Sequence, residues 1–164
     1  MICGNLHCRF KSNHCAMANT YSKVILHIVF AVKNNNSYIP ATYLRRLHAY
    51  MSGILKHKGH YPYEIGGTNS HVHILMGYNI NQPIPDAVRD IKSATSKHIN
   101  ESHIIPFRFE WQKGYGCFSY SPSQIDAVRG YIKHQYEHHK NISLEQEIKH
   151  ILDKFGVPFD ENIS

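Results

Sequence analysis

Two short segments, far apart in the chain, hold side chains whose types and spacing suit metal-assisted chemistry. His71-Val72-His73 lies within an apolar run that predicts a buried strand. Because side chains alternate faces along a strand, both imidazoles should point the same way. In a helical pattern further on, Tyr131 and Gln135 are four residues apart and share one face. Two imidazoles, an amide oxygen and a phenol offer three metal ligands and a nucleophile, a set that suits cleavage of a phosphodiester.

Other interpretations of these histidines are open, because the chain contains 14 of them. The pair could be packed or surface histidines. Burying two imidazoles without partners is costly, however, and a divalent ion would offset that cost. Neutral imidazole suits Mn²⁺ better than Mg²⁺. His134 and His138 form a competing pair at helical spacing, but they lack the carboxylate of H-E-x-x-H sites. His138 and His139 continue the Tyr131 face as contacts to the substrate or the metal ligands, or form a solvated helix end.

The length and charge of the chain suit one compact domain with a polyanionic partner. It has 164 residues, 42% of them hydrophobic, and a net charge of +6. Residues 17–142 hold 14 Lys and Arg against 7 Asp and Glu, whereas residues 143–164 hold 2 against 5. A basic body with an acidic tail favours a polyanion, although an ordinary soluble protein of high pI would look the same. No run reaches the ~20 apolar residues of a membrane span, so no membrane partner is expected.

The amino-terminal segment 1–16 is predicted to be a disordered extension ahead of the folded domain. Three of the four cysteines lie here, at spacings that match no common zinc motif. The segment lacks the apolar stretch of a signal peptide. Since nothing requires disulfides, a reducing cytoplasm is the expected location. Strand-like sequence begins soon after Met17, which places the domain at 17–142 and an acidic helix and tail at 143–164.

The order of elements predicts a ferredoxin-like, RRM-like sandwich of the α+β class. Strands are expected at 24–32, 61–68, 70–76 and 107–120, and helices after Pro40, Pro83 and Ser121. The first six elements give the β-α-β-β-α-β plan. A helix that carries Tyr131 and a short amphipathic helix at 144–155 are appended to it. The second of these is acidic and is expected to pack on the surface or on a partner.

Several segments of the sequence resemble the single-tyrosine HUH transposases of the IS200-like insertion sequences. His71-Val72-His73 is similar to the HUH motif, in which a hydrophobic residue separates two histidines, and Tyr131-x-x-x-Gln135 resembles the helix of the nucleophile. Similar segments at 91–101, 111–119 and 131–139 extend the resemblance from about residue 20 to residue 152. The chain departs from the family in its first 16 residues and at Cys117, where a small residue such as alanine is expected.

The resemblance implies a DNA transposase that cuts and rejoins single-stranded DNA at the ends of an insertion sequence. His71, His73 and Gln135 would hold one divalent ion, Mg²⁺ or Mn²⁺, at the scissile phosphate. Tyr131 would attack the phosphorus, forming a covalent 5′-phosphotyrosine intermediate and a free 3′-hydroxyl. The resemblance also implies DNA with subterminal hairpins as the partner. It further implies a homodimer in which the tyrosine helix of one subunit can serve the histidines of the other.

Basic and aromatic side chains on the body of the domain are candidate DNA contacts. The cations would bind phosphates, and the aromatic rings would stack on unpaired bases. The candidates are Lys33, Tyr38, Arg45, Arg46, Arg89, Lys92, Lys97, Trp111 and Lys113. Each of them could equally be an ordinary solvated side chain.

Two alternative functions are compatible with the sequence. A domesticated REP-associated tyrosine transposase, or another HUH nickase, would use the same residues but would lack flanking inverted hairpin ends and multiple gene copies. A non-catalytic RRM-like module would instead bind single strands through exposed aromatic residues on its central strands. The transposase interpretation places the protein in a prokaryotic cytoplasm, associated with the nucleoid.

Overall fold

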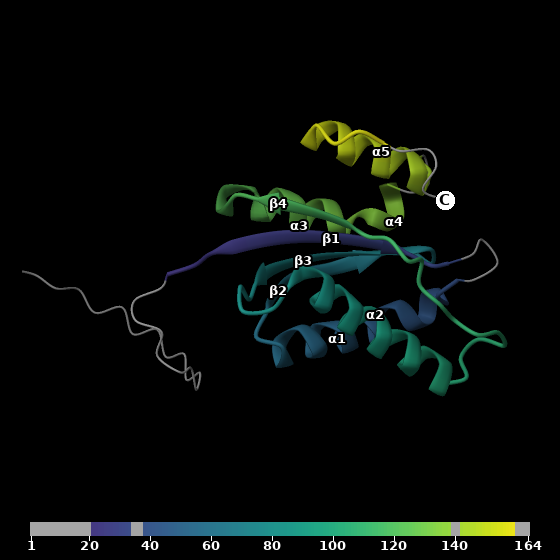
Figure 1. Cartoon of the computed structure of the whole chain (residues 1–164). Coiled ribbons are helices and arrows are strands. Elements are labelled where there is room, and N and C mark those ends of the chain that lie inside the picture. Colours follow the sequence, from purple (N-terminus) through teal and green to yellow (C-terminus); the bar gives the residue numbers. More distant parts are fainter. Residues whose placement is uncertain (1–20, 34–37, 139–141, 160–164) are drawn as a thin grey trace, which may run out of the picture.

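The computed structural model describes residues 21–33, 38–138 and 142–159 (Figure 1). The predicted extension at 1–16 lies outside this range. None of the described helices has the length and apolar character needed to cross a bilayer. The elements follow in the order β1 (Val24–Ala31), α1 (Ala41–His57), β2 (Tyr61–Gly67), β3 (His71–Tyr78), α2 (Ile84–Glu101), β4 (Gly116–Tyr120), η1 (Pro122–Gln124), α3 (Ile125–Lys133), α4 (Gln135–His138) and α5 (Leu144–Phe155).

The strands form one antiparallel sheet in the order β2-β3-β1-β4. Strand β1 lies between β3 and β4, with Val29 opposite His73 on one side and Ile28 opposite Cys117 on the other. The β2–β3 pair is a hairpin closed by the turn at 68–70. This order of strands, with α1 and α2 as the crossover helices, confirms the predicted ferredoxin-like plan of the α+β class.

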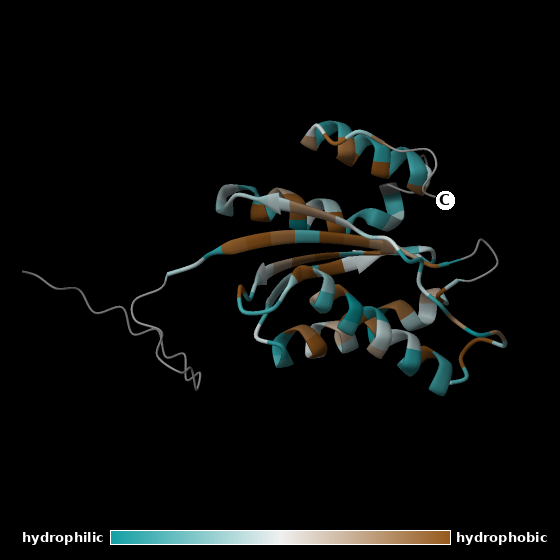
Figure 2. Cartoon of the chain, viewed as in Figure 1, coloured by the Kyte–Doolittle hydropathy of each residue, from teal (hydrophilic) through white to brown (hydrophobic). Residues whose placement is uncertain are grey.

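Helices α1 and α2 cover one face of the sheet and form the larger hydrophobic core (Figure 1). Strand β1 is apolar along most of its length, as its brown ribbon in Figure 2 shows, because both of its faces are covered. Burying a large aliphatic side chain contributes about 1.5–3 kcal/mol. The core on this face includes Leu26, Ile28 and Phe30 of β1, Val72, Ile74 and Met76 of β3, and Leu47, Met51, Val88 and Ile91 of the helices.

Helices α3, α4 and α5 lie over the opposite face of the sheet (Figure 1). Val128 and Ile132 of α3 pack in a cluster with β1 and β3, and Ile151 of α5 packs with Val29 and Phe118. The sequence predicted α5 on the surface or on a partner. It is instead packed on the sheet of its own chain, because one side of its amphipathic pattern is apolar enough to be buried.

The ends of α5 explain why it forms a separate helix. The backbone N–H of Gln146 donates to Oγ of Ser143 at 3.2 Å, and the backbone N–H of Ser143 donates to Oε1 of Gln146 at 3.0 Å. This reciprocal capping box satisfies two otherwise unpaired donors. Gly156 ends the helix in the left-handed region, at φ 65°, which favours glycine.

The fourth strand is shorter than the sequence predicts. The alternating pattern at 107–120 indicated one long strand, but only Gly116–Tyr120 pairs continuously with β1. Upstream of it, Phe109 and Trp111 turn into the core, and Trp111 forms an isolated bridge with Val32. Burial of the aromatic rings therefore prevails over regular strand pairing in this segment.

The helix that carries Tyr131 and Gln135 is also interrupted. Helix α3 ends at Lys133 and α4 begins at Gln135, with His134 between them. The imidazole of His134 donates from Nδ1 to the carbonyl of Gly130 at 2.7 Å. The two site residues consequently approach the sheet from two short helices rather than from one continuous face.

Gly66 of β2 lets α3 approach the sheet closely. A Cβ atom at this position would lie 2.6 Å from the carbonyl oxygen of Ile132 and 2.7 Å from its Cγ2. The missing side chain therefore sets the depth at which the helix of Tyr131 packs. Gly130, on α3 itself, is different, because none of the described atoms lies within 4 Å of a Cβ added there.

Replacing Gly66 with alanine should lower the free energy of unfolding by about 1–3 kcal/mol, because the methyl group would press on the α3 backbone. Gly130→Ala should raise it by up to about 1 kcal/mol, since alanine is favoured over glycine inside a helix. Urea denaturation of both variants and the wild type measures the difference. A Gly66→Ala variant as stable as the wild type would contradict this close packing.

Candidate active site

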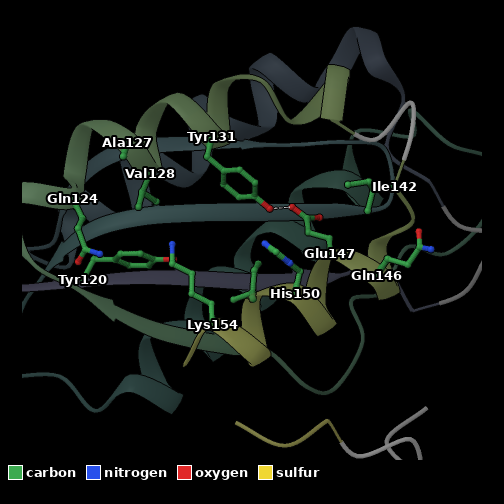
Figure 3. A pocket seen from close by; sticks show the side chains of 11 residues that line it. Tyr120, Gln124, Ala127, Val128, Tyr131, Ile142, Gln146, Glu147, His150 and Lys154 are labelled. Atoms are coloured by element: carbon green, nitrogen blue, oxygen red, sulfur yellow. Dashed lines mark hydrogen bonds between the residues drawn. The ribbon is translucent and has the colours of Figure 1, made fainter. Parts of the chain in front are cut away.

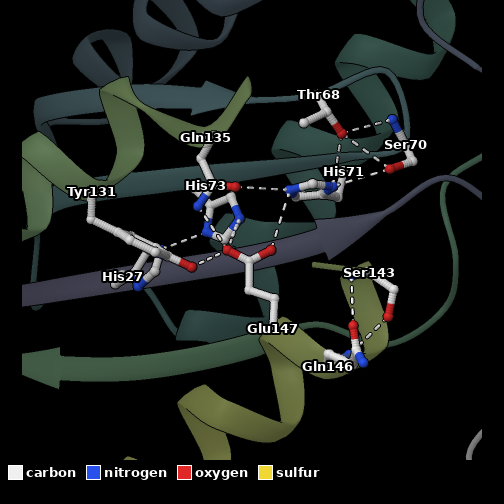
Figure 4. Close-up of polar contacts among 10 residues, drawn as sticks. All are labelled: His27, Thr68, Ser70, His71, His73, Tyr131, Gln135, Ser143, Gln146 and Glu147. Carbon is white, nitrogen blue, oxygen red and sulfur yellow. Dashed lines mark hydrogen bonds and ion pairs between the residues drawn. The ribbon is translucent and has the colours of Figure 1, made fainter. Parts of the chain in front are cut away.

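The two histidines of β3 lie on the sheet face that α3, α4 and α5 cover. Strand alternation puts His71 and His73 on this face and Val72 in the core on the other. Both imidazoles have exposed fractions of 0%. Their Nε2 atoms are directed toward α5 (Figure 4). The strand thus fixes both rings with one nitrogen each facing a common point.

A carboxylate from α5 occupies that point. Glu147 is 2% exposed, and its carboxylate oxygens lie 3.6 Å from Nε2 of His71 and 3.5 Å from Nε2 of His73. One potential ligand atom from each of the three residues lies within 4.8 Å of the others. Glu147 is not among the site residues predicted from the sequence. A signal was present, because Glu147 stands four residues before Ile151 and so falls on the buried side of an amphipathic helix.

The phenol of Tyr131 and the amide of Gln135 contact the same carboxylate (Figure 4). Tyr131 donates from Oη to Oε1 of Glu147, and Gln135 donates from Nε2 to the same oxygen at 2.7 Å. Oε1 of Gln135 lies 3.4 Å from Nε2 of His71, and the rings of Tyr131 and His73 have centroids 5.8 Å apart. All of these atoms belong to one chain, so the two segments singled out in the sequence meet within a single subunit.

Burial and hydrogen bonding fix the charge states of Glu147 and Tyr131. Burial alone would raise the pKa of Glu147, but hydrogen bonding and charge attraction from His73, with hydrogen bonds from Tyr131 and Gln135, hold it well below its ordinary value. Burial raises the pKa of Tyr131 far above its ordinary value, and the hydrogen bond to Glu147 raises it further. At neutral pH the site therefore holds a protonated phenol against an ionised carboxylate.

Hydrogen bonds to the far nitrogen of each imidazole orient the two histidines. Nδ1 of His71 lies 3.0 Å from Oγ1 of Thr68 and 3.1 Å from Oγ of Ser70. Nδ1 of His73 lies 2.9 Å from Nε2 of His27, a buried residue of β1. Burial, followed by the proximity of His73, lowers the pKa of His27 to about 3, so that this imidazole is neutral. In the neutral tautomer that carries its hydrogen on Nδ1, Nε2 of each site histidine would be the nitrogen that binds a metal ion.

This set of residues fits a divalent metal ion. Two imidazole nitrogens and a carboxylate oxygen suit Mn²⁺ and similar ions. Hydrogen bonds from Nδ1 to a neighbouring acceptor are the usual support of a metal-binding imidazole. A buried ionised carboxylate also favours a cation beside it. The set differs from the predicted His71, His73 and Gln135 by the addition of Glu147.

Five of the predicted DNA contacts gather around one hollow beside α2. The hollow has a volume of about 460 Å³ and is lined in part by Lys33, Arg89, Lys92, Trp111 and Lys113. Lys92 already donates to the carbonyl of Gln112 at 2.8 Å. The hollow therefore brings together residues from three separate segments, and Glu110, which forms an ion pair with Lys33, also lines it.

Trp111 is not placed to stack on a DNA base, which corrects the prediction. Its side chain is 7% exposed and packs edge-to-face with Phe30 and Phe109. The indole N–H donates to Oγ1 of Thr95 at 2.9 Å. An exposed position was expected from its aromatic type alone, but the ring belongs to the hydrophobic core.

The remaining predicted contacts lie outside this hollow. Arg45 and Arg46 are exposed on α1. On α2, Nζ of Lys97 lies 3.8 Å from Oε1 of Glu101. Tyr38 is 47% exposed and lines a separate hollow near the turn that orients His71. His139 and the side chain of His138 lie outside the described part of the chain.

Comparisons with known proteins point to one family. The family described as "Transposase IS200 like" matches residues 20–135. Among solved structures, the chain is similar to a "putative transposase" from Deinococcus radiodurans R1, with a TM-score of 0.58, 19% identity, and coverage of 74% of this chain and 98% of that one. It is also similar to a REP-associated tyrosine transposase bound to a REP hairpin, with a TM-score of 0.56, 12% identity, and coverage of 77% and 74%. No curated protein matches.

Two histidines of the sheet, a carboxylate of α5 and a tyrosine of α3 therefore meet in one cluster that combines metal ligands with a nucleophile-type side chain. Because the family match covers most of its length, the chain belongs to the Transposase IS200 like family. Membership of this family supports the activity of a transposase. The two solved structures, at these low identities, support the fold.

The contact between His27 and His73 predicts a positioning role for His27. His27→Leu removes the hydrogen-bond partner of Nδ1 of His73, which would favour the tautomer with its hydrogen on that nitrogen. The population of this tautomer should fall, and Mn²⁺ binding should weaken by about 10–100-fold. His27→Gln should keep most of the affinity, because its amide oxygen can accept the same hydrogen. ¹⁵N NMR of the imidazoles in metal-free protein reports the tautomer, and a Mn²⁺ titration reports the affinity.

The matched control for this prediction is His60→Gln. His60 is a buried histidine that bonds to Gln82, away from the site. Its substitution should leave both the His73 tautomer and Mn²⁺ binding unchanged. The positioning role is contradicted if His27→Leu retains the wild-type tautomer and affinity.

Proposed function

We propose that this protein cuts and rejoins single-stranded DNA at the ends of an insertion sequence through a covalent 5′-phosphotyrosine at Tyr131. The observation that carries the proposal is the convergence of Tyr131, His71 and His73 on the Glu147 carboxylate within one chain. Membership of the transposase family supports it. The similarity to a tyrosine transposase bound to a REP hairpin favours a hairpin DNA substrate.

His71, His73 and Glu147 would hold one divalent ion, Mg²⁺ or Mn²⁺, with the amide oxygen of Gln135 as a further ligand. Bound there, the ion would neutralise negative charge on the scissile phosphate and on the carboxylate. The two imidazoles favour Mn²⁺ over Mg²⁺. Because Glu147 comes from α5, the proposed catalytic unit includes part of the acidic segment that the sequence placed beyond the 17–142 domain.

Tyr131 is the proposed nucleophile. Its Oη forms a bond to phosphorus, the bond from phosphorus to the 3′ oxygen of the preceding nucleotide breaks, and that oxygen takes up a proton. In this structure the phenol donates a hydrogen bond to Glu147, and the proton lost from Oη balances the one that the 3′ oxygen takes up. Because burial and the Glu147 charge raise the Tyr131 pKa, neutralising that charge favours loss of the proton. The phosphotyrosyl bond conserves the energy of the broken phosphodiester, so a 3′-hydroxyl can reverse the step without ATP.

The basic side chains of the domain would contact the DNA hairpin. Lys33, Arg89 and Lys113 line the hollow beside α2, where phosphate groups would be attracted. The protein would act as a homodimer. Since each chain assembles Tyr131 next to His73, each subunit would carry its own complete site. A DNA substrate of this kind would be met at the nucleoid of a prokaryotic cytoplasm, which is the location we propose.

A domesticated REP-associated tyrosine transposase is the second candidate, and the similarity to the hairpin-bound structure favours it. It would use the same residues on a different DNA. The RRM-like module is not favoured, because its central strands would need exposed aromatic residues on one sheet face. Helices cover both faces of the sheet here, and strands β1 and β3 are buried along most of their length (Figure 1).

The covalent intermediate gives the direct test of Tyr131. Incubation with Mn²⁺ and a 3′-labelled single-stranded hairpin, copied from the DNA that flanks the gene, should give a protein–DNA adduct on a denaturing gel. Tyr131→Phe should reduce the adduct at least a hundredfold, because the phenyl ring has no oxygen to attack phosphorus. His71→Ala and removal of the metal with EDTA should do the same while sparing hairpin binding.

Tyr136→Phe is the matched control, because Tyr136 lies on the neighbouring helix α4 and is 64% exposed. It should form the adduct at the wild-type rate. An undiminished adduct in Tyr131→Phe, or its loss in Tyr136→Phe only, would refute the assignment of the nucleophile.

A further inference from the structure

A cavity of about 660 Å³ opens between α3 and α5 beside the phenol of Tyr131 (Figure 3). Tyr131 and Glu147 lie between Ile142 and Gln146 on one side and Tyr120, Gln124 and Lys154 on the other. The cavity is therefore continuous with the proposed site. Its volume falls within the ~300–1,000 Å³ typical of small-molecule sites.

The cavity wall combines an apolar surface with an aromatic ring and a cation. Val128 and Ile151 contribute aliphatic surface, and Tyr120 contributes its ring. The ammonium group of Lys154 lies 5.6 Å from the centroid of the Tyr120 ring. His150 adds a further polar group. An aromatic face beside a cation is the combination that binds single-stranded nucleic acid, in which the base stacks and the phosphate pairs with the charge.

The charge of the lining also favours an anion. Glu147 is the one acidic residue among those described as lining the cavity, and its carboxylate faces the histidines of β3 rather than Lys154. Lys154 lies on the side of Tyr120, away from the carboxylate (Figure 3). A phosphate next to Lys154 would therefore meet a cation without a competing carboxylate.

We infer that this cavity takes the nucleotide whose 5′ phosphate becomes joined to Tyr131. The inference rests on the proposed function, because the phosphotyrosyl bond would tether this nucleotide to Oη, which borders the cavity. Its base lies against Tyr120 and Val128, and the next phosphate along the strand pairs with Lys154. The cavity thereby holds the cut 5′ end in place until a 3′-hydroxyl rejoins it.

Ala127→Phe tests this directly, because Ala127 is an exposed residue of α3 that lines the cavity and lies outside the hydrophobic clusters. Filling the cavity with a phenyl ring should slow adduct formation about tenfold and leave hairpin affinity within twofold. Lys154→Met should raise the KM for the DNA about threefold with little change in kcat. This second variant keeps the test decisive if the bulky phenylalanine displaces α5.

An abasic substrate identifies the nucleotide. Removing the base just 3′ of the cleaved bond should slow the wild type about tenfold, in line with about 1–3 kcal/mol per stacked base. Removing the same base should slow adduct formation by Ala127→Phe little further, because the phenyl ring already excludes the base from the cavity. The controls are Ala49→Phe on α1 and Lys149→Met, whose ammonium pairs with Glu145 at 2.9 Å. Both should match the wild type.

Two outcomes separate this inference from the proposed function. Equal adduct rates in the wild type, Ala127→Phe and Lys154→Met at DNA concentrations below the KM would overturn the nucleotide site and leave the Tyr131 chemistry intact. Absence of any Tyr131-dependent adduct in the wild type would overturn both.

Discussion

The buried carboxylate of Glu147 is the interaction on which the arrangement of the site depends. An ionised group with an exposed fraction of 2% is costly to bury unless charges or donors surround it. Here the partners come from three elements: the imidazoles of β3, the phenol of α3 and the amide of α4. The contacts of this one carboxylate therefore fix α3, α4 and β3 relative to one another. They also fix α5, because α5 carries Glu147.

This interaction also gives the site two opposed properties. It concentrates ligand atoms suited to a divalent ion, while it keeps Tyr131 protonated by raising its pKa. The phenol is thus held in position and remains weakly nucleophilic until the carboxylate charge is neutralised. If the proposed metal binds, its occupancy and the activation of Tyr131 would be coupled through the position of this one residue. The nucleotide cavity opens at the same point, so α5 contributes to both the chemistry and the proposed binding of the strand.

Residues whose positions follow from local patterns were predictable from the sequence. Strand alternation placed His71 and His73 on one face, and the order of strands and helices predicted the ferredoxin-like plan. The role of α5 was not predictable in this way, because an acidic amphipathic helix can be buried against a partner or against its own chain. The role of His27 was not predictable either, since His27 and His73 lie on neighbouring strands but are 46 residues apart in the sequence. The prediction that Trp111 contacts DNA was wrong, because an aromatic residue in the sequence can belong either to a surface that stacks on bases or to the hydrophobic core.

The central claim is that Tyr131 and the histidines act within the same chain, as their distances indicate. Mixing Tyr131→Phe and His71→Ala subunits, with one of them carrying a size tag, tests this directly by following adduct formation on hairpin DNA. Each variant alone has half of the site intact. The account predicts that the mixture stays as inactive as its components, because neither chain holds a complete site. Recovery of an adduct on the His71→Ala chain would show that Tyr131 serves the histidines of its partner and would contradict the account.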